Sequence, residues 1–219
     1  MLAYLQKRQK QLEYPPNEAP DRWSLSTLFR ASHLLRLPFY RRATVEVARD
    51  LLGCILIHHR TAGMIVEVEA YLGLDDLAAH ASRGVTPRTR VIFGPPGRAY
   101  IYFIYGMHEC LNVVAEPEGK AGCVLIRALE PLTGVAEMYR RRQWKGTPQG
   151  LANGPGKLTE ALGISRAQYG LRFDRTPLEI RRWKSMPEFT IAATPRIGIR
   201  HCAEWPLRFV WKNHPCLSR

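Results

Sequence analysis

Two segments of the chain carry side chains whose types can do proton chemistry on a flat ligand. The first, IVEVEAYLG over residues 65–73, places the carboxylate of Glu69 in an apolar, strand-like run, and His80 follows it. The second, AYIYFIYG over residues 99–106, contains three closely spaced tyrosines. Carboxylates and imidazoles act as acids or bases, and aromatic rings stack on unpaired bases. The combination indicates a site that stacks a flat, π-rich ligand and performs proton chemistry beside it.

The alternation of a strand sorts these side chains by face. Glu67, Glu69 and Tyr71 are two residues apart, so a strand presents both carboxylates and the phenol on one face. The alternation does not choose between Glu67 and Glu69 as the reactive acid. A structural alternative also stands, in which Glu69 is a buried acid paired with an arginine such as Arg127.

The aromatic residues have a structural alternative as well. Alternation along residues 99–106 sends Tyr100 and Tyr102 to one face and Tyr105 to the other. All three can be core residues of a strand, and an isolated histidine such as His80 is more often structural than catalytic.

The elements that must position these residues follow from periodicity and from turn residues. Strands and helices do not alternate regularly, which favours an α+β fold with a largely antiparallel sheet. We expect helices at 45–52 (capped by Thr44 and ended by Gly53), 75–81 (carrying His80), 132–144 and 154–163, strands at 54–59, 64–71, 99–106, 123–131, 197–202 and 207–211, a turn at Thr61–Gly63 and a loop at Arg83–Gly97.

Length and composition predict one folded domain. A chain of 219 residues with 46% hydrophobic residues can bury a single core without needing two domains. Residues 1–30 are polar and contain Pro15, Pro16 and Pro20, so we expect a loosely ordered N-terminal extension followed by a single domain at 31–219.

Cysteine usage and hydropathy indicate an intracellular protein. The chain has five cysteines and no CxxC pair, which favours reduced thiols over a disulfide framework. It contains no apolar run of the roughly 20 residues that a membrane span needs, and its start lacks the apolar core of a signal peptide. We expect a cytoplasmic, nucleoid-associated location and no membrane partner.

The net charge favours a polyanionic partner. Lys and Arg number 32 against 19 Asp and Glu, a formal charge of +13. Together with the aromatic cluster this favours nucleic acid, because sites for unpaired bases combine a phosphate-attracting surface with stacking platforms. The arginine-rich segments at 83–98, 140–142 and 172–182 are candidate phosphate contacts, some of which must be ordinary solvated faces.

Other site types fit the sequence poorly. NGPGKLTEA over residues 153–161 lacks the GxxxxGK[ST] spacing of a phosphate loop and is better explained as a helix start. The His–Cys neighbours have no recognised metal-ligand spacing, and GxSxG is absent. We therefore expect neither a metal nor a cofactor.

Several motifs taken in order resemble one family. EVEAYLG with the following His80, PGRAYIYFIYGMHECLN, VLIRALEP, NGPGKLTEALGI, and PRIGI with PLRF are together similar to the alkyladenine (3-methyladenine) DNA glycosylases. The resemblance runs from about Pro38 to Trp211 and depends on no single motif. It implies a mostly antiparallel curved sheet surrounded by helices, with a protruding β-hairpin that enters the DNA minor groove.

The resemblance also implies roles for residues at matching positions. Glu69, rather than Glu67, matches the general base that activates the attacking water. Tyr71, His80 and Tyr102 match the residues that enclose the extruded base.

Three further positions complete the implied site. Tyr105 matches the side chain that fills the vacated stack, and Asn112 matches the pocket residue that crowds the exocyclic amino group of guanine. Arg127 matches a basic partner near the DNA backbone and the active site.

The function implied is a monofunctional DNA glycosylase that flips out alkylated or deaminated purines and hydrolyses the N-glycosidic bond, which starts base excision repair. The expected partner is double-stranded DNA with damaged purines, bound by a monomer. The alternative is a non-catalytic protein that binds damaged or single-stranded nucleic acid through the same aromatics. Glu69 separates the two, because a carboxylate facing a polyanion benefits a hydrolase and not a binder.

Overall fold

The fold is organised around one long strand, β3 (Thr61–Tyr71), in a computed structural model that describes residues 21–186 and 188–218. Strand β6 (Cys123–Thr133) runs antiparallel along one edge of β3. Two strands share the other edge: β2 (Ile55–His58) pairs with residues 61–64 and β10 (Arg208–Trp211) with residues 67–69. β3 therefore joins the two parts of the sheet.

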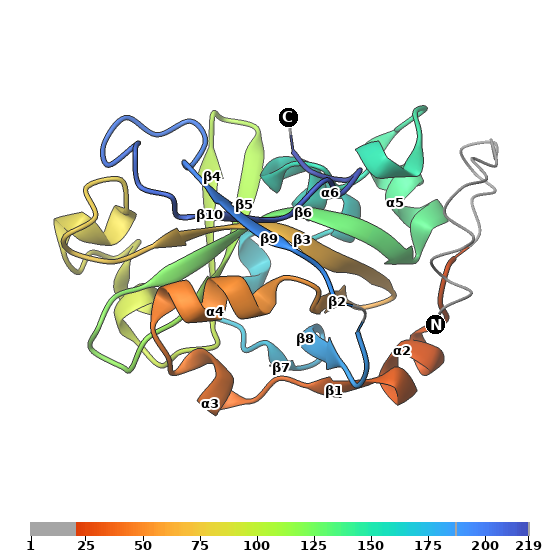
Figure 1. The fold of residues 1–219 in the computed structure, drawn as a ribbon, viewed down its shortest axis with the longest axis horizontal. Coiled ribbons are helices and arrows are strands. Elements are labelled where there is room, and N and C mark those ends of the chain that lie inside the picture. Colours follow the sequence, from red (N-terminus) through yellow and green to blue (C-terminus); the bar gives the residue numbers. More distant parts are fainter. Residues whose placement is uncertain (1–20, 187, 219) are drawn as a thin grey trace.

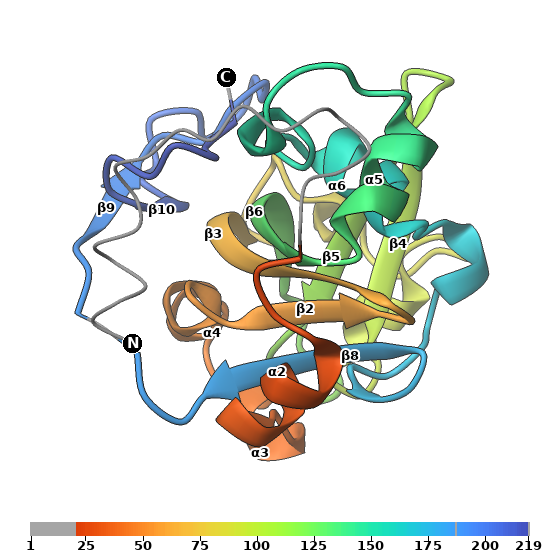
Figure 2. The same cartoon turned by 90° about the vertical axis from the view of Figure 1, so that its right-hand side faces the viewer.

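The remaining strands extend this centre into a ten-stranded sheet with the main order β1-β8-β2-β3-β6-β5-β4. Every pairing among the described strands is antiparallel, and Figure 2 shows β2 and β8 side by side. The predicted α+β class with a largely antiparallel sheet is confirmed. The other strands are β1 (Ser32–Leu34), β4 (Ala99–Ile104), β5 (His108–Val114), β7 (Asp174–Arg175), β8 (Leu178–Trp183) and β9 (Ile191–Thr194).

Helices surround the sheet (Figure 1). The described α-helices are α2 (Leu25–Ala31), α3 (Leu37–Tyr40), α4 (Thr44–Leu51), α5 (Val135–Arg142) and α6 (Pro155–Leu162), and short 3₁₀ helices occur at η2 (His80–Arg83), η3 (Arg90–Phe93), η4 (Pro148–Gly150) and η5 (Arg166–Gln168). The predicted helix start at Pro155 and stop at Gly163 are confirmed; Gly163 has φ 69°, the left-handed geometry that ends helices. Thr44 is the first residue of α4 rather than its cap, and its hydroxyl binds Glu116 instead.

A register shift in β3 decides which side chains face the site. Ile65, Val68 and Ala70 belong to the main core cluster, whereas Met64 and Val66 belong to the second. The face that meets the main core thus changes from odd to even positions, and the β3–β6 pairing shifts between Ile65 and Val68. An extra residue in one strand reverses the alternation beyond it. This shift turns the carboxylates of β3 away from the main core.

Three predicted elements are wrong in detail. Residues 75–79 form turns rather than a helix, because the Asp76 carboxylate accepts hydrogen bonds from the backbone N–H groups of Leu72 and Ala78 and so stabilises a loop. Residues 197–202 are irregular, and β9 pairs with β10 in place of the strand expected there. The turn before β3 lies at 59–60, since Thr61 already pairs with His58.

Most of the expected N-terminal extension, residues 1–20, lies outside the described residues. The part that is described packs onto the domain: α2 begins at Leu25, and Leu28 is fully buried in the second core cluster. Folded structure therefore starts earlier than the expected boundary at residue 31. No helix within the described ranges is long and apolar enough to cross a membrane.

Candidate functional site

A cavity of about 390 Å³ opens between the β4–β5 hairpin, the central strands and the loop after β9. Its size suits a single flat organic ligand. The residues that line it include Tyr71 on β3, His80 on η2, Tyr100 and Tyr102 on β4, Cys110 and Asn112 on β5, Cys123, Leu125 and Arg127 on β6, Pro155 and Gly156 at the start of α6, and residues 197–199.

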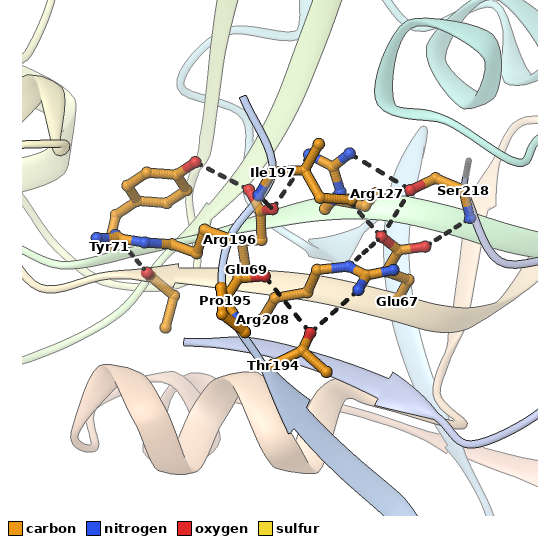
Figure 3. A network of polar contacts seen from close by, with 11 residues as sticks. Glu67, Glu69, Tyr71, Arg127, Thr194, Pro195, Arg196, Ile197, Arg208 and Ser218 are labelled. Carbon is orange, nitrogen blue, oxygen red and sulfur yellow. Dashed lines mark hydrogen bonds and ion pairs between the residues drawn. The ribbon is translucent and has the colours of Figure 1, made fainter. Parts of the chain in front are cut away.

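Glu69 is fully buried directly behind this wall. Its Oε1 accepts a hydrogen bond from the backbone N of Ile197 (2.7 Å) and lies 3.2 Å from Arg127 Nη1. Its Oε2 accepts one from the Tyr71 hydroxyl (2.9 Å), as Figure 3 shows. The partners of Glu69, namely Tyr71, Arg127 and Ile197, all line the cavity, whereas Glu69 itself lies behind them and is not a lining residue. Tyr71 is the one described donor to Oε2, which leaves a lone pair there for another, such as water.

Glu67 has a different environment, although it lies on the same strand face and is equally buried. Its Oε1 lies 2.9 Å from Arg127 Nε and 2.8 Å from Arg208 Nε, and accepts from the Ser218 hydroxyl (2.7 Å). The Ser218 backbone N donates to Oε2 at 2.6 Å. Burial alone would raise the pKa of this carboxyl, but the Ser218 and Arg208 contacts lower it overall. Glu67 is therefore a charged anchor held by four donors, and it is not among the residues that line the cavity.

Arg127 bridges the two carboxylates. Burial disfavours its charge, but Glu69 and Glu67 together raise the pKa of its guanidinium. Burial and the neighbouring Glu69 also raise the pKa of Tyr71, so its hydroxyl keeps the proton that it donates. The Glu69–Arg127 ion pair that the structural alternative expects is therefore present. Its arginine lines the cavity, so the pair belongs to the site.

The segment before Ile197 is fixed by a second buried ion pair. Arg196 Nη2 lies 2.8 Å from Asp76 Oδ1, and both side chains are fully buried. The guanidinium also lies over the Tyr71 ring at 4.7 Å. The Asp76 carboxylate also accepts hydrogen bonds from backbone N–H groups of the loop that leads to His80. The Asp76–Arg196 ion pair therefore connects this loop to Tyr71 and to the segment that carries the Ile197 amide.

His80 and Tyr102 form an aromatic corner of the cavity. Their rings meet edge to face, with centroids 4.6 Å apart and an interplanar angle of 81°. His80 Nδ1 lies 2.8 Å from the Tyr100 hydroxyl, and Arg88 Nη2 lies 3.3 Å from Nε2. Arg88 can only donate, so Nε2 accepts and Nδ1 carries the proton. Burial, with Arg88 and Arg83, lowers the pKa of His80 to about 4, which makes the ring neutral at pH 7.

The cavity floor is polar but carries no charge at neutral pH. Asn112 is 2% exposed, and its side-chain nitrogen donates to the Tyr100 carbonyl at 3.1 Å. Burial raises the pKa of the Cys110 thiol and that of the Cys123 thiol, the latter to about 12, so both stay protonated. The amide is thus fixed in orientation on an otherwise weakly polar floor.

Tyr105 lies at the tip of the β4–β5 hairpin, which projects from the sheet in Figure 1. It has φ 55° and is followed by Gly106 at φ 67°, so the chain reverses here in left-handed conformations. Tyr105 is 76% exposed and Met107 68% exposed. The predicted hairpin is confirmed, and its tip presents apolar side chains to solvent beside the cavity mouth.

The structure brings together all seven residues proposed from the sequence. Tyr71, His80, Tyr102, Tyr105, Asn112 and Arg127 line the cavity, and Glu69 lies behind them. The Arg127 side chain is 8% exposed and contacts both Glu67 and Glu69.

Sequence reasoning missed several contributors. The Ile197 amide, the Asp76–Arg196 pair and Ser218 act across long stretches of chain, and no local pattern marks them. PRIGI was part of the resemblance, but a strand was expected there. Within the described residues, no three His, Cys, Asp or Glu side chains gather as metal ligands.

Comparison with known proteins places the chain in a family. The family model described as methylpurine-DNA glycosylase matches residues 38–215. A Methanoculleus marisnigri protein is 51% identical over 189 residues, covering 83% of this chain and 96% of its own length. A Rhodopseudomonas palustris protein is 50% identical over 186 residues (85% and 88%) and a Legionella pneumophila protein 45% identical over 193 (85% and 98%). Each of the three is described as a "Putative 3-methyladenine DNA glycosylase". The chain belongs to the methylpurine-DNA glycosylase family.

Proposed function

We propose that this protein is a monofunctional DNA glycosylase that removes alkylated or deaminated purines from double-stranded DNA, the class that includes 3-methyladenine, 7-methylguanine, hypoxanthine and ethenoadenine. The observation that carries the proposal is the position of Glu69, a buried carboxylate behind the wall of an aromatic cavity, with Arg127 and the Ile197 amide fixing its orientation. Family membership and the descriptions of the relatives support the same reaction.

In this arrangement the reaction needs one water molecule as the nucleophile and one carboxylate as the general base. The damaged nucleotide leaves the duplex and its base enters the cavity between Tyr71, His80 and Tyr102. Water bound at Oε2 of Glu69 attacks the sugar carbon, its proton passes to the carboxylate, and the C–N bond breaks with its electron pair moving to the base. A 3-methyladenine base is cationic in DNA, and that electron pair neutralises it, so this lesion needs no strong acid to leave.

Selectivity follows from the walls and the floor. Tyrosine faces attract a cationic base by about 0.5–2 kcal/mol. A fixed Asn112 amide leaves no room for the exocyclic amino group of guanine, which disfavours the ordinary base. Unstacking costs a few kcal/mol, and the cost is smallest at damaged pairs.

An excision assay on duplexes with one defined lesion each tests the proposal. We expect release of at least one free purine base, which leaves an abasic site, with undamaged duplex as the control. The rate should be unchanged by chelator, because the proposed base that activates the water is Glu69 and not a metal ion. Borohydride should trap no enzyme–DNA adduct, because the proposed nucleophile is water and not a lysine. Failure to release any lesion base, combined with tight binding to the same duplexes, would support the non-catalytic binder instead.

A further inference from the structure

The C-terminal segment reaches the back of the proposed active site through one residue, Ser218. Its hydroxyl donates to Glu67 Oε1 (2.7 Å) and accepts from Arg127 Nη2 (3.3 Å), while its backbone N donates to Glu67 Oε2 (2.6 Å). Figure 3 shows Ser218 beside this pair, on the side away from Tyr71. One side chain therefore touches both members of a buried ion pair.

Arg127 is held at three of its nitrogens. Nε faces Glu67, Nη2 faces Ser218, and Nη1 faces Glu69 at 3.2 Å. Because a guanidinium is planar and rigid, fixing Nε and Nη2 determines the direction of Nη1. The orientation of the group that contacts Glu69 is thus set by Glu67 and Ser218.

We propose that Ser218 is a positioning residue: together with Glu67 it aligns Arg127 so that Glu69 presents Oε2 to the attacking water. The inference rests on the proposed function. It extends the site beyond the family match, which covers residues 38–215 and does not include Ser218.

The charged side chains around Ser218 support a positioning role for this residue rather than a role in packing. Two carboxylates, Glu67 and Glu69, are balanced by Arg127 and Arg208, and all four side chains are at most 15% exposed. In such a network the ions stay in place only if their remaining hydrogen-bonding positions are filled. Ser218 fills positions on two of them at once.

Three variants test the role: Ser218→Ala removes the hydroxyl, Ser218→Thr keeps it, and Ser26→Ala removes an exposed hydroxyl on α2 as a control. Single-turnover excision, lesion-DNA Kd and thermal unfolding are measured for each. Ser218→Ala removes the two hydrogen bonds that the hydroxyl makes with Glu67 and Arg127. We expect the maximal rate to fall roughly tenfold, with Kd within about twofold, because hydrogen bonds to charged groups are stronger than those between neutral groups. Ser218→Thr should restore the rate, and Ser26→Ala should match the parent protein.

Two results would overturn the inference. One is a Ser218→Ala protein that excises at the parent rate per folded molecule; the other is a loss that Ser218→Thr does not restore.

A measurement that does not depend on enzyme activity separates this inference from the proposed function. Proton exchange at Arg127 Nη2, the nitrogen that donates to Ser218, should be faster in Ser218→Ala than in the parent and Ser218→Thr when it is followed by ¹⁵N NMR in the absence of DNA. If no variant or parent excises any lesion, the proposed function fails, yet the exchange rates still decide whether Ser218 fixes Arg127. Equal exchange rates at Arg127 in the parent protein and in Ser218→Ala would contradict the proposal that Ser218 fixes the orientation of Arg127.

Discussion

Two neighbouring glutamates of β3, Glu67 and Glu69, differ in their hydrogen-bond partners and therefore in their ability to act as a base. Glu67 and Glu69 share a strand, a face and complete burial. Glu67 has four donors and its pKa is lowered by Ser218 and Arg208 against burial. Oε2 of Glu69 accepts a hydrogen bond only from Tyr71 among the described residues, and Tyr71 lines the cavity. Strand alternation did not choose between the two carboxylates, and the contacts favour Glu69 as the base, in agreement with the family resemblance.

His80 gives a prediction about pH. Burial and Arg88 hold its pKa near 4, below the ordinary value of 6.5. The folded state therefore binds fewer protons than the unfolded chain between these values, and the contribution of His80 to stability falls as pH drops from about 6.5 to 4. An NMR titration of the imidazole should show a midpoint near 4 that rises in Arg88→Ala.

Arg90→Ala is the matched control for this titration, because Arg90 is an exposed arginine of the same loop. Its midpoint should equal that of the parent protein. A parent midpoint near 6.5, or an Arg88→Ala midpoint that does not move, would show that His80 is not held neutral in the way described.

At the scale of elements, the β3 register shift and the β4–β5 hairpin build the site. Strand alternation correctly predicted that Glu67, Glu69 and Tyr71 gather on one side of β3, although Glu67 itself lies within the register shift. Both carboxylates contact Arg127, and Tyr71 donates to Glu69. Alternation could not predict that these side chains point away from the main core, because a β-bulge has no reliable local sequence pattern. The aromatic run predicted a single strand at 99–106, and only the family resemblance implied a hairpin, which the structure forms from β4 and β5. The exposure of its tip fits the implied wedge.

The hairpin tip carries its own prediction. Tyr105 is 76% exposed, so Tyr105→Ser should change the free energy of unfolding by no more than about 0.5 kcal/mol. If Tyr105 holds the duplex open, the same variant should slow excision of a paired lesion by roughly tenfold or more. Thermal unfolding and single-turnover excision of the same preparation measure both effects.

A lesion in single-stranded DNA provides the control for Tyr105→Ser, because no partner strand needs to be displaced. Its excision should be much less affected than that of the paired lesion. A large loss of thermal stability with an unchanged rate per folded molecule would instead show that Tyr105 acts as a packing residue.

At the scale of the whole molecule, the sequence predicted the residues of the site better than the scaffold that orients them. The fold class and five of the ten described strands, β2, β3, β4, β6 and β10, followed from periodicity. Three orienting contacts did not: the Ile197 amide on Glu69, Ser218 on Glu67, and Asp76 with Arg196. Each joins β3, or the loop that follows it, to the last 25 or so residues, and local patterns carry no information at that separation. The expected helix at 75–81 is wrong for a local reason, since the Asp76 carboxylate accepts hydrogen bonds from the Leu72 and Ala78 backbone N–H groups. The strand expected at 197–202 is wrong because β9 pairs with β10 instead.

The assignment of Glu69 as the general base is tested by the single-turnover excision rate of Glu69→Gln. The amide keeps the shape of the side chain but cannot take a proton from water. We expect the rate on a lesion that the parent excises to fall by about 10²–10⁴-fold, with lesion-DNA Kd largely unchanged and the variant folded at the assay temperature. Glu46→Gln on the surface of α4 is the control and should retain the parent rate. Near-parent excision by folded Glu69→Gln would contradict the assignment.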